Sequence, residues 1–572
     1  MSAKETDSPY IQTVAARLIY WATLQPDREA YIFLSPRIGR STLTRRNVKD
    51  MAFTFAERLT DLGLRQGDVV CNTLQNSPER VVTDLGIMTS GCVMVDKRAF
   101  LRDVSDMVHV LNKSEARLVI VDPGEKKENE FPSAWGAIRS QCTVIGDVDT
   151  ATSSVTVTWP DVTSLQRVMF CPRGDSGTEF EFLNTLKTSQ HPKTSPKENG
   201  TVKEKKTIVL PSDLAALFPT SGSTGQSKLS AFTQASVLAI ADNWQHLFKL
   251  QDDDVIFQDR PVGWVAAFHH SYLASGTPRV MTDGRTQVPE SCPDSVWSFI
   301  AQEGVTFAHL TPQTVSKLLA RPDLIGKHNV TLRALLMTGQ PIKKHMARTI
   351  GTLAQRMYNS YGATETAYLT AGRFEKESDF DDFLVGYPHP RAQIRVVDDN
   401  LRPVRPGVTG EVLVRCQGQF EGYRGEEEKT KKTLLPGGWV RTDDLGLIDD
   451  RGRLFMFGRQ SDAIMRGVVI IYPYTIEKSL ARIPGVQDVM VVAVPDPELF
   501  HEICACVVVS PGSDVTAESL KESCSEVNAQ WHNELPSVKY VLLFDAFPTT
   551  GTGKAGRKLL QAEACTMLGL QP

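Results

Sequence analysis

The segment from Thr220 to Lys228 contains the residue types that bind phosphate. It reads TSGSTGQSK and follows the apolar run LAALFP, which predicts a glycine-containing loop at the end of a strand. Backbone N–H groups and hydroxyls of such a loop can surround phosphate oxygens, and the lysine adds a positive charge. The loop is not a Walker A motif, because its glycines are three apart and a serine precedes the lysine. Alone, it fits phosphate binding and an ordinary Ser/Gly surface loop equally well.

Four further polar strings follow along the chain in a fixed order. They are NSYGATE at 359–365, GWVRTDDLG at 438–446, Gly458-Arg459, and PTTGTGK at 548–554. Taken singly, a charged residue in any of them is more often an exposed charge than a ligand-binding group. The strings are informative as a set, because an unrelated chain is not expected to contain all of them in the same order.

Alternating helical and strand patterns predict the elements that position these strings. Apolar residues at helical spacing predict a helix over Asn47–Leu64, and short β-branched runs predict buried strands at Asp68–Asn72, Gly91–Val95 and Arg117–Val121. Strands separated by helices favour parallel sheets in an α/β architecture. The sequence therefore predicts an α/β fold for the N-terminal part of the chain.

The last 110 residues or so predict a separate compact unit. Thr475–Ile483 has a helical pattern, and Val486–Val494 and Ile503–Val509 have strand patterns. Cys504 and Cys506 lie two apart in the last of these strands, so their side chains should share one face. The ten cysteines form no Cys-x-x-Cys pair, and we interpret them as buried apolar side chains.

Residues 186–206 interrupt the alternating pattern. The segment has six lysines, two prolines and no aromatic residue, which makes burial unfavourable. It predicts a disordered surface insertion, with a basic contact patch as the alternative.

Composition excludes several classes of protein. The 572 residues carry 63 Lys and Arg against 67 Asp and Glu, a formal net charge of −4, so we expect no nucleic-acid partner. No run of 18 apolar residues occurs, so we expect no transmembrane segment. Glu5 and Asp7 and the absence of an apolar core argue against a targeting peptide. We expect a cytoplasmic protein. A mitochondrial or peroxisomal location stays open as an alternative, although the sequence has no clear targeting signal for either. The oligomeric state is not predicted.

The ordered motifs resemble those of the adenylate-forming superfamily of acyl-CoA synthetases, 4-coumarate:CoA ligases, beetle luciferases and peptide-synthetase adenylation domains. The resemblance is nearest to the medium-chain acyl-CoA ligase branch, in the segment that holds Arg466-Gly467 and Ile471–Pro473. It implies a large N-terminal AMP-binding domain of parallel and mixed sheets with helices over 1–460. A small, mobile α+β C-terminal AMP-binding domain would follow over 461–572. Gly422-Tyr423 matches a family landmark to which we assign no chemistry.

The resemblance also implies roles for single residues. Lys554, Thr364 and Glu365 would be catalytic: Lys554 neutralises the α-phosphate, Thr364 places a hydroxyl near the phosphates, and Glu365 holds Mg²⁺. Asp444 would accept the ribose hydroxyls, and Arg459 would bridge ribose and phosphate. The other residues implied to bind ATP are, at the phosphates, Thr220, Ser221, Gly222, Ser223, Thr224, Gly225, Gln226, Ser227 and Lys228, and, in the two motifs beside the adenine, Gly339, Gln340, Pro341, Asn359, Ser360, Tyr361 and Gly362.

Two regions differ from the family pattern. Trp264 stands where the family has an aromatic residue or His that shapes the acyl pocket, and VAAFHH after it lacks the Asp that holds an amino-acid ammonium. In the CoA segment Arg466, Gly467 and Val468, the valine stands where family members have a glycine beside the pantetheine. Ser461 and Thr475 also replace the usual hinge residues. The residues for adenylation are therefore predicted to be intact, and those for thioester formation altered.

We expect an acid–thiol ligase that uses ATP, Mg²⁺ and CoA. A small carboxylic acid, with a medium-chain fatty acid as first choice, would react with ATP to give acyl-AMP and pyrophosphate, and CoA would then capture the acyl group. Two alternatives stay open. One is transfer of the acyl group to a carrier protein or amine instead of CoA. The other is a non-catalytic paralogue that binds nucleotide and serves in regulation.

Overall fold

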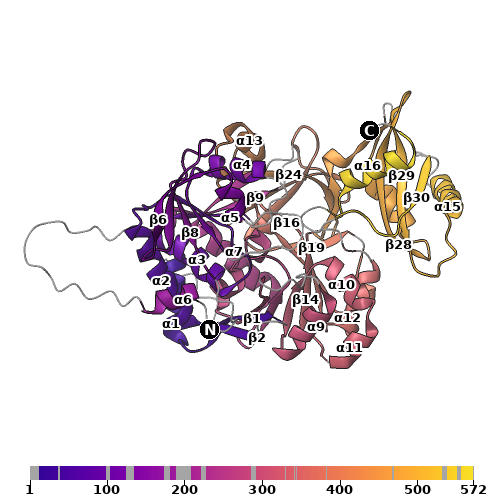
Figure 1. The fold of residues 1–572 in the computed structure, drawn as a ribbon. Helices are drawn as coiled ribbons and strands as arrows, with labels where there is room; N and C mark the ends of the chain where they lie inside the picture. The colour runs from indigo at the N-terminus through magenta and orange to yellow at the C-terminus, as the bar shows by residue number, and fades with distance from the viewer. Residues whose placement is uncertain are drawn as a thin grey trace, which may run out of the picture.

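The computed structural model describes residues 12–35, 39–97, 104–123, 134–172, 181–188, 208–220, 227–284, 292–328, 330–339, 342, 344–381, 383–466, 469–530, 538–549 and 555–570. Two large sheets with helices on their faces form the body, and the C-terminal part of the chain forms a smaller lobe beside it (Figure 1). Within these residues, no helix is long and apolar enough to cross a membrane.

The first sheet has 14 strands in the described part of the chain. In spatial order these are β2 (Gly39–Thr44), β1 (Glu29–Ser35), β12 (Arg279–Thr282), β11 (Ile256–Gln258), β13 (Phe307–Leu310), β14 (Ala334–Thr338), β15 (Met357–Ser360), β18 (Thr370–Phe374), β19 (Leu384–Pro388), β25 (Leu454–Arg459), β24 (Trp439–Ile448), β21 (Gly410–Cys416) and β20 (Ala392–Val397), with β23 (Leu434–Leu435) beside β24. Neighbouring strands from β1 to β15 are parallel, whereas those from β15 to β20 are antiparallel.

The second sheet has nine strands among the described residues. Their order is β22 (Gly422–Tyr423), β10 (Lys228–Thr233), β9 (Leu214–Thr220), β4 (Val93–Asp96), β3 (Val69–Asn72), β5 (Ala116–Val121), β8 (Arg167–Phe170), β7 (Ser154–Thr158) and β6 (Thr143–Asp149). Strands from β9 to β8 are parallel. The three strands predicted from β-branched runs are β3, β4 and β5, so the prediction of a parallel α/β sheet is confirmed.

Successive side chains of the buried strands point into different cores, as the period of two requires. In β5, Leu118 and Ile120 enter the core between the sheets, and Val119 and Val121 enter the core on the outer face. The central core contains side chains of α1 (Val14–Leu24), α2 (Arg45–Asp61), α3 (Pro78–Ser90), α6 (Glu181–Thr188), α7 (Gln234–Phe248) and α8 (His270–Ser275). α2 confirms the helix predicted at 47–64, although it begins two residues earlier and ends three earlier.

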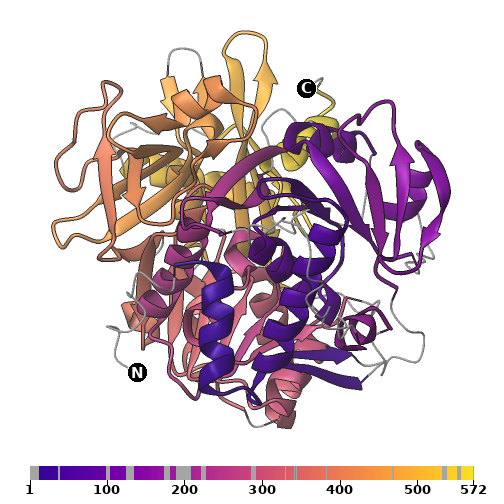
Figure 2. The ribbon, with the colours of Figure 1, turned by 90° about the vertical axis from the view of Figure 1, so that its left-hand side faces the viewer.

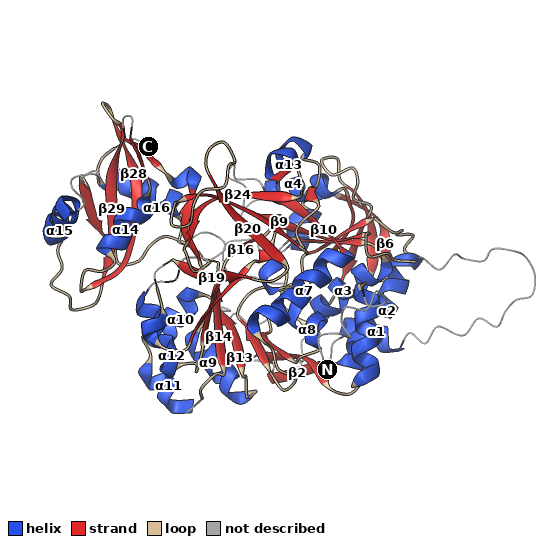
Figure 3. Cartoon of the chain, turned by 180° about the vertical axis from the view of Figure 1, so that it is seen from behind, coloured by secondary structure: helices blue, strands red, loops and turns tan. Residues whose placement is uncertain are grey.

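Further helices cover the outer faces (Figure 3). α9 (Pro293–Gln302), α10 (Pro312–Leu319), α11 (Pro322–His328) and α12 (Thr349–Thr352) lie along the first sheet, and α4 (Val104–Ser114) and α5 (Ala134–Arg139) cover the second. α13 (Glu427–Thr433) buries none of its residues. A short hairpin of β16 (Gly362–Ala363) and β17 (Ala367–Tyr368) follows β15.

The insertion predicted at 186–206 is wrong at its first three residues. Residues up to Thr188 belong to α6, and Leu186 is only 3% exposed because it packs into the central core. Leu186 continues the helical spacing of the apolar residues before it. The lysine-rich composition of 186–206 made this spacing hard to recognise in the sequence. Residues 189–206 lie outside the described part of the chain.

The C-terminal lobe is an α+β unit, seen behind the body in Figure 2. Its sheet contains β26 (Ile464–Arg466), β27 (Val469–Ile471), β28 (Val486–Asp496), β29 (Phe500–Val509) and β30 (Tyr540–Leu543). α14 (Pro473–Leu480) and α15 (Ala517–Gln530) pack on one face, and α16 (Arg557–Met567) packs on the other. Cys504 and Cys506 both face α16 and are free, as predicted.

Candidate active site

The parallel strands of both sheets end at residues that the sequence assigns to the nucleotide site. β9 ends at Thr220, β14 ends one residue before Gly339, and β15 ends at Ser360. Ligands of α/β proteins bind beyond the carboxyl ends of parallel strands. Gly339 has a φ of 90°, which glycine adopts without strain, so the chain can turn sharply beyond β14.

Tyr361, Asp444 and Arg459 form one hydrogen-bonded group. Asp444 and Arg459 face each other in register on β24 and β25, with Arg459 Nε 3.2 Å from Asp444 Oδ1. The Tyr361 hydroxyl donates to Asp444 Oδ2 at 2.6 Å. Burial raises the pKa of the Asp444 carboxyl, and the neighbouring arginine and tyrosine oppose that rise. A ribose that binds Asp444 would therefore share its two oxygens with Tyr361 and Arg459 or displace them.

Thr364 and Glu365 lie half-buried in the turn between β16 and β17. The turn is tight: a Cβ at Gly362 would lie 1.7 Å from the carbonyl oxygen of Ala367, so only glycine fits there. The buried Thr366 hydroxyl accepts a hydrogen bond from the backbone at the start of the turn at 3.3 Å. These constraints fix where the two predicted catalytic side chains leave the backbone.

Glu365 and Lys228 meet through Tyr423, a residue to which the sequence gave no chemical role. The Tyr423 hydroxyl donates to Glu365 Oε1 at 2.5 Å. Lys228 Nζ lies 3.3 Å from the same hydroxyl and 4.4 Å from the ring centroid. Burial and the Glu365 charge raise the pKa of Tyr423, so it stays a neutral donor. Tyr423 lies beside Lys228 because β22 pairs with β10, a pairing across almost 200 residues that motif spacing does not reveal.

Asn359 and Ser360 use their side chains to hold the fold together. The Asn359 amide donates to the carbonyl of Leu384 at 2.8 Å, and the Ser360 hydroxyl donates to that of Thr370 at 2.7 Å. Both side chains are buried. Any contact of these two residues with ATP would therefore be made through the backbone.

The two ends of the predicted phosphate loop are fixed side by side. Thr220 and Lys228 pair across β9 and β10, and Ser227 contacts Asp106 through its N–H and its hydroxyl at 3.4 Å each. The Thr220 hydroxyl is buried and has no hydrogen-bond partner among the described residues, so it can accept or donate to a ligand. Residues 221–226 of the loop lie outside the described part of the chain, as do Gln340, Pro341, Gly467, Val468 and Lys554.

The predicted acid and acceptor residues lie in different parts of the molecule. Trp264 is half-buried in the segment that follows β11, with the Arg260 guanidinium 5.6 Å from its ring centroid. Arg466 lies in the C-terminal lobe, where Glu502 binds its guanidinium through two hydrogen bonds of 2.8 and 2.9 Å. Arg466 is therefore paired with a carboxylate of its own lobe.

Two family models match the chain. The model of the AMP-binding enzyme covers residues 19–424, and that of the AMP-binding enzyme C-terminal domain covers residues 475–554. The first spans well over half of the chain. This protein belongs to the AMP-binding enzyme family. The resemblance deduced from the ordered motifs is thereby confirmed.

Curated relatives of this AMP-binding enzyme include ligases for different acids. The medium-chain acyl-CoA ligase ACSF2, mitochondrial, of Mus musculus is 25% identical over 565 residues, which cover 96% of this chain and 87% of the mouse protein. A salicylyl-CoA synthase / salicylate adenylyltransferase of Streptomyces sp. is 28% identical over 546 residues, 91% of this chain and 89% of that protein. One name specifies a medium-chain acid and the other an aromatic acid, so the relatives do not define a single substrate.

Solved structures share the fold of this chain. ATP-bound MatB from Rhodopseudomonas palustris superposes with a TM-score of 0.75 at 20% identity, over 97% of this chain and 99% of MatB. The expected α/β fold with a large N-terminal part and a smaller C-terminal part is confirmed by this likeness.

Proposed function

We propose that this AMP-binding enzyme is an acid–thiol ligase that converts a carboxylic acid and ATP to acyl-AMP and pyrophosphate, and then transfers the acyl group to CoA. The observation that carries the proposal is the Tyr361–Asp444–Arg459 group. Tyr361 directly follows β15, and Asp444 and Arg459 lie on the adjacent strands β24 and β25 of the same sheet. Two carboxylate oxygens facing a tyrosine and an arginine suit a ribose and its neighbouring phosphate.

The phosphates would lie between Lys228, Thr220 and the turn that carries Thr364. Lys228 supplies charge, and Thr220 supplies a hydroxyl that has no partner among the described residues. Attack of an acid on the α-phosphorus builds negative charge on phosphate oxygens, so charge and position do most of the catalytic work. We assign Lys554 to the α-phosphate, because it lies in the PTTGTGK motif at the start of the last helix.

Magnesium fits this arrangement as an ion that arrives with ATP. In the described part of the chain, no three His, Cys, Asp or Glu side chains come together as a metal site. Mg²⁺ usually binds one or two protein carboxylates together with substrate phosphates and water, so Glu365 alone suffices on the protein side. When bound, the ion would neutralise charge on the phosphates. Tyr423 donates to Glu365 Oε1 only, so the other carboxylate oxygen of Glu365 could hold the ion.

The two half-reactions would use a movement of the C-terminal lobe. We place the domain boundary between residues 460 and 461, because the last strand of the first sheet ends at Arg459 and the C-terminal sheet begins at Ile464. Rotation about this boundary would present Lys554 for adenylation and the Arg466–Val468 segment for thioester formation. Cytoplasmic location remains part of the proposal, although the mouse relative is named mitochondrial.

A second acceptor is supported by the small lobe. Arg466 is bound to Glu502 in a bidentate pair, and Val468 takes the place of the glycine expected beside pantetheine. Both features differ from the segment expected for CoA, and they keep transfer of the acyl group to a carrier protein or an amine open as the alternative. A medium-chain fatty acid remains the first choice of acid, from the similarity to ACSF2 and the absence of an ammonium-binding Asp after Trp264.

Pyrophosphate release tests the proposal. The purified protein is given Mg-ATP and a panel of medium-chain aliphatic, aromatic and amino acids, each with and without CoA. The proposal expects acid-dependent pyrophosphate release and an acyl-CoA product. Acyl-AMP that accumulates with no acyl-CoA supports the second acceptor. ATP binding without release for any acid supports the non-catalytic paralogue.

A further inference from the structure

A group of buried charged residues lies against the segment that carries Trp264. Arg80 and Asp84 lie one turn apart on α3, Asp96 ends β4, and His269 ends the segment itself. All four residues are at most 5% exposed. α3 holds its start firmly, because the Ser77 hydroxyl caps the helix and a proline occupies its first position.

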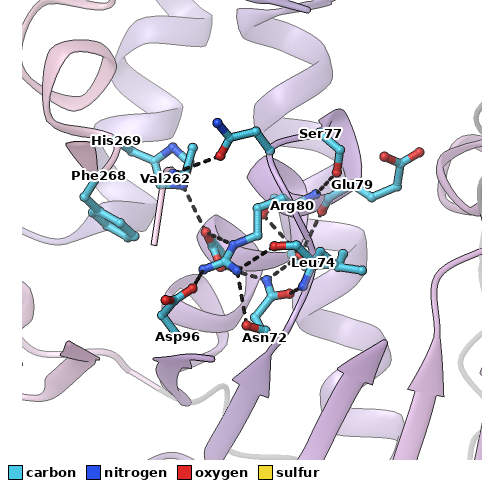
Figure 4. Close-up of polar contacts among 12 residues, drawn as sticks. Asn72, Leu74, Ser77, Glu79, Arg80, Asp96, Val262, Phe268 and His269 are labelled. Carbon is cyan, nitrogen blue, oxygen red and sulfur yellow. Dashed lines mark hydrogen bonds and ion pairs between the residues drawn. The ribbon is translucent and has the colours of Figure 1, made fainter. Parts of the chain in front are cut away.

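Arg80 is the centre of this group (Figure 4). Its Nε donates to Asp84 Oδ2 at 2.7 Å and an Nη donates to Asp96 Oδ1 at 2.7 Å. The other Nη donates to the carbonyls of Asn72 and Leu74 at 3.1 and 2.9 Å. The planar guanidinium therefore fixes the distance between α3 and the carboxyl ends of β3 and β4, which a lysine with one nitrogen cannot do.

Both ends of the segment 260–269 are attached to this group. A Cβ at Gly263 would lie 1.9 Å from Asp96 Oδ1, so the carboxylate rests directly on the backbone beside Trp264. Asn76 Oδ1 accepts the N–H of Val262 at 2.9 Å, just before α3 begins. At the other end, His269 Nε2 lies 3.4 Å from Asp84 Oδ2.

The charges define one arrangement of this segment. Burial alone would lower the pKa of Arg80, but Asp84 and Asp96 raise it above its usual value, so the guanidinium stays charged. Burial alone would raise the pKa of Asp84, but Arg80 and His269 lower it below its usual value. Burial lowers the pKa of His269 to about 4, so its ring is neutral. The Nε2–H then faces Asp84, and Nδ1 accepts from the Tyr31 hydroxyl 2.8 Å away.

Stability alone does not require such a group. Buried ion pairs often add little to the free energy of folding compared with apolar residues of the same size, but they penalise every other arrangement of their partners. Here the partners are α3 and β4 of the second sheet and the strand-end segment of the first sheet. The segment follows β11 at the carboxyl edge, where ligands of α/β sheets bind.

We propose that Arg80 and Asp96 are positioning residues for the acid substrate: they lock residues 260–269 to the second sheet and thereby place Trp264 at the acid-binding side of the active site. The inference rests on the proposed function for its substrate, but the locking itself is independent of it. Among the described residues, neither Arg80 nor Asp96 makes a hydrogen bond or ion pair with Lys228, Glu365 or Asp444. Substitutions at Arg80 and Asp96 should therefore affect binding of the acid more than binding of ATP.

The test compares Arg80→Gln, Arg80→Lys and Asp96→Asn with the parent protein. Pyrophosphate release gives KM for the acid and for ATP, and hydrogen exchange gives the protection of the amides in 260–269. We expect KM for the acid to rise about tenfold or more in Arg80→Gln and Asp96→Asn, since small misplacements at a reacting group have large effects. KM for ATP should change less than about twofold, and Arg80→Lys should fall between parent and Arg80→Gln.

Arg333→Gln is the matched control. Arg333 Nε donates to the buried Asp254 at 2.9 Å in a second bidentate pair, at the amino ends of β14 and β11, opposite the proposed site. It should lower the melting temperature without changing KM for the acid or the protection of 260–269.

Two results would overturn the inference. One is unchanged exchange in 260–269 for Arg80→Gln and Asp96→Asn. The other is an equal rise of both KM values, as general destabilisation would give. If Arg80→Gln fails to fold, Asp96→Asn decides, because the asparagine has almost the same shape. If the parent protein releases no pyrophosphate with any acid, the proposed function fails, and the exchange measurement still tests the locking.

Discussion

Asp444 should account for the preference of this protein for ATP over 2′-deoxy-ATP. Asp444 Oδ2 accepts from the Tyr361 hydroxyl, and Oδ1 lies against Arg459. In the proposed function both oxygens accept hydrogen bonds from the ribose hydroxyls. A hydrogen bond to a charged group contributes about 1.5–3 kcal/mol. Because Tyr361 and Arg459 each contact one of the two oxygens already, we expect the lower end, which is about tenfold in Kd for each hydroxyl.

Calorimetric titration of both nucleotides measures this effect in the parent and in Asp444→Ala. The parent should bind ATP about tenfold more tightly than 2′-deoxy-ATP, and Asp444→Ala should weaken ATP about tenfold or more and bring the two nucleotides within about twofold. Asp443→Asn is the control, because it removes one negative charge directly beside Asp444 at an exposed residue. Asp443 has a φ of 57°, which asparagine also tolerates. A variant at Asp444 that keeps the parent's preference for ATP would refute the assignment of this residue to the ribose.

Three further outcomes are expected. Glu365→Gln should shift the Mg²⁺ dependence of pyrophosphate release to higher concentration, because the amide lacks the charge that a small hard cation requires; overlapping Mg²⁺ titrations would make Glu365 a structural charge. Asp444→Asn should raise the melting temperature at neutral pH, because burial raises the pKa of the Asp444 carboxyl in the folded protein. The carboxyl stabilises the folded state fully below its unfolded-state pKa near 3.8, and this stabilisation is lost as the pH rises through the folded-state pKa. This gain should vanish in acid, and a lower melting temperature at neutral pH would contradict it. Val468→Gly should speed thioester formation from preformed acyl-AMP and leave adenylation unchanged, whereas a level or slower rate would mean that Gly467 already provides the opening.

Three parallel strands of the second sheet could be predicted from sequence because each is a short apolar run that contains β-branched residues. The runs at 68–72, 91–95 and 117–121 became β3, β4 and β5, and the C-terminal strands matched equally well. The nucleotide residues could be located because they lie in ordered motifs. Leu186 was predicted to lie in the insertion because of the lysine-rich composition of the segment. Its helical spacing instead puts it in α6, where it packs into the central core.

The contacts between motifs could not be predicted. Tyr423 reaches Glu365 only because β22 pairs with β10, and His269 reaches Asp84 only because α3 and α8 both pack into the core between the sheets. Both contacts join residues far apart in the chain, and neither leaves a local pattern. Local spacing predicts elements and loops, whereas the partners of a buried charge depend on how the sheets pack.

Acid-dependent exchange of pyrophosphate into ATP tests the central claim most directly, because it reports formation of acyl-AMP without any acceptor. The account predicts exchange that requires both Mg²⁺ and an acid, proceeds without CoA, and is lost by orders of magnitude in Lys554→Ala while ATP still binds. Tight binding of ATP with no exchange for any acid would contradict it, and so would an unchanged rate in Lys554→Ala.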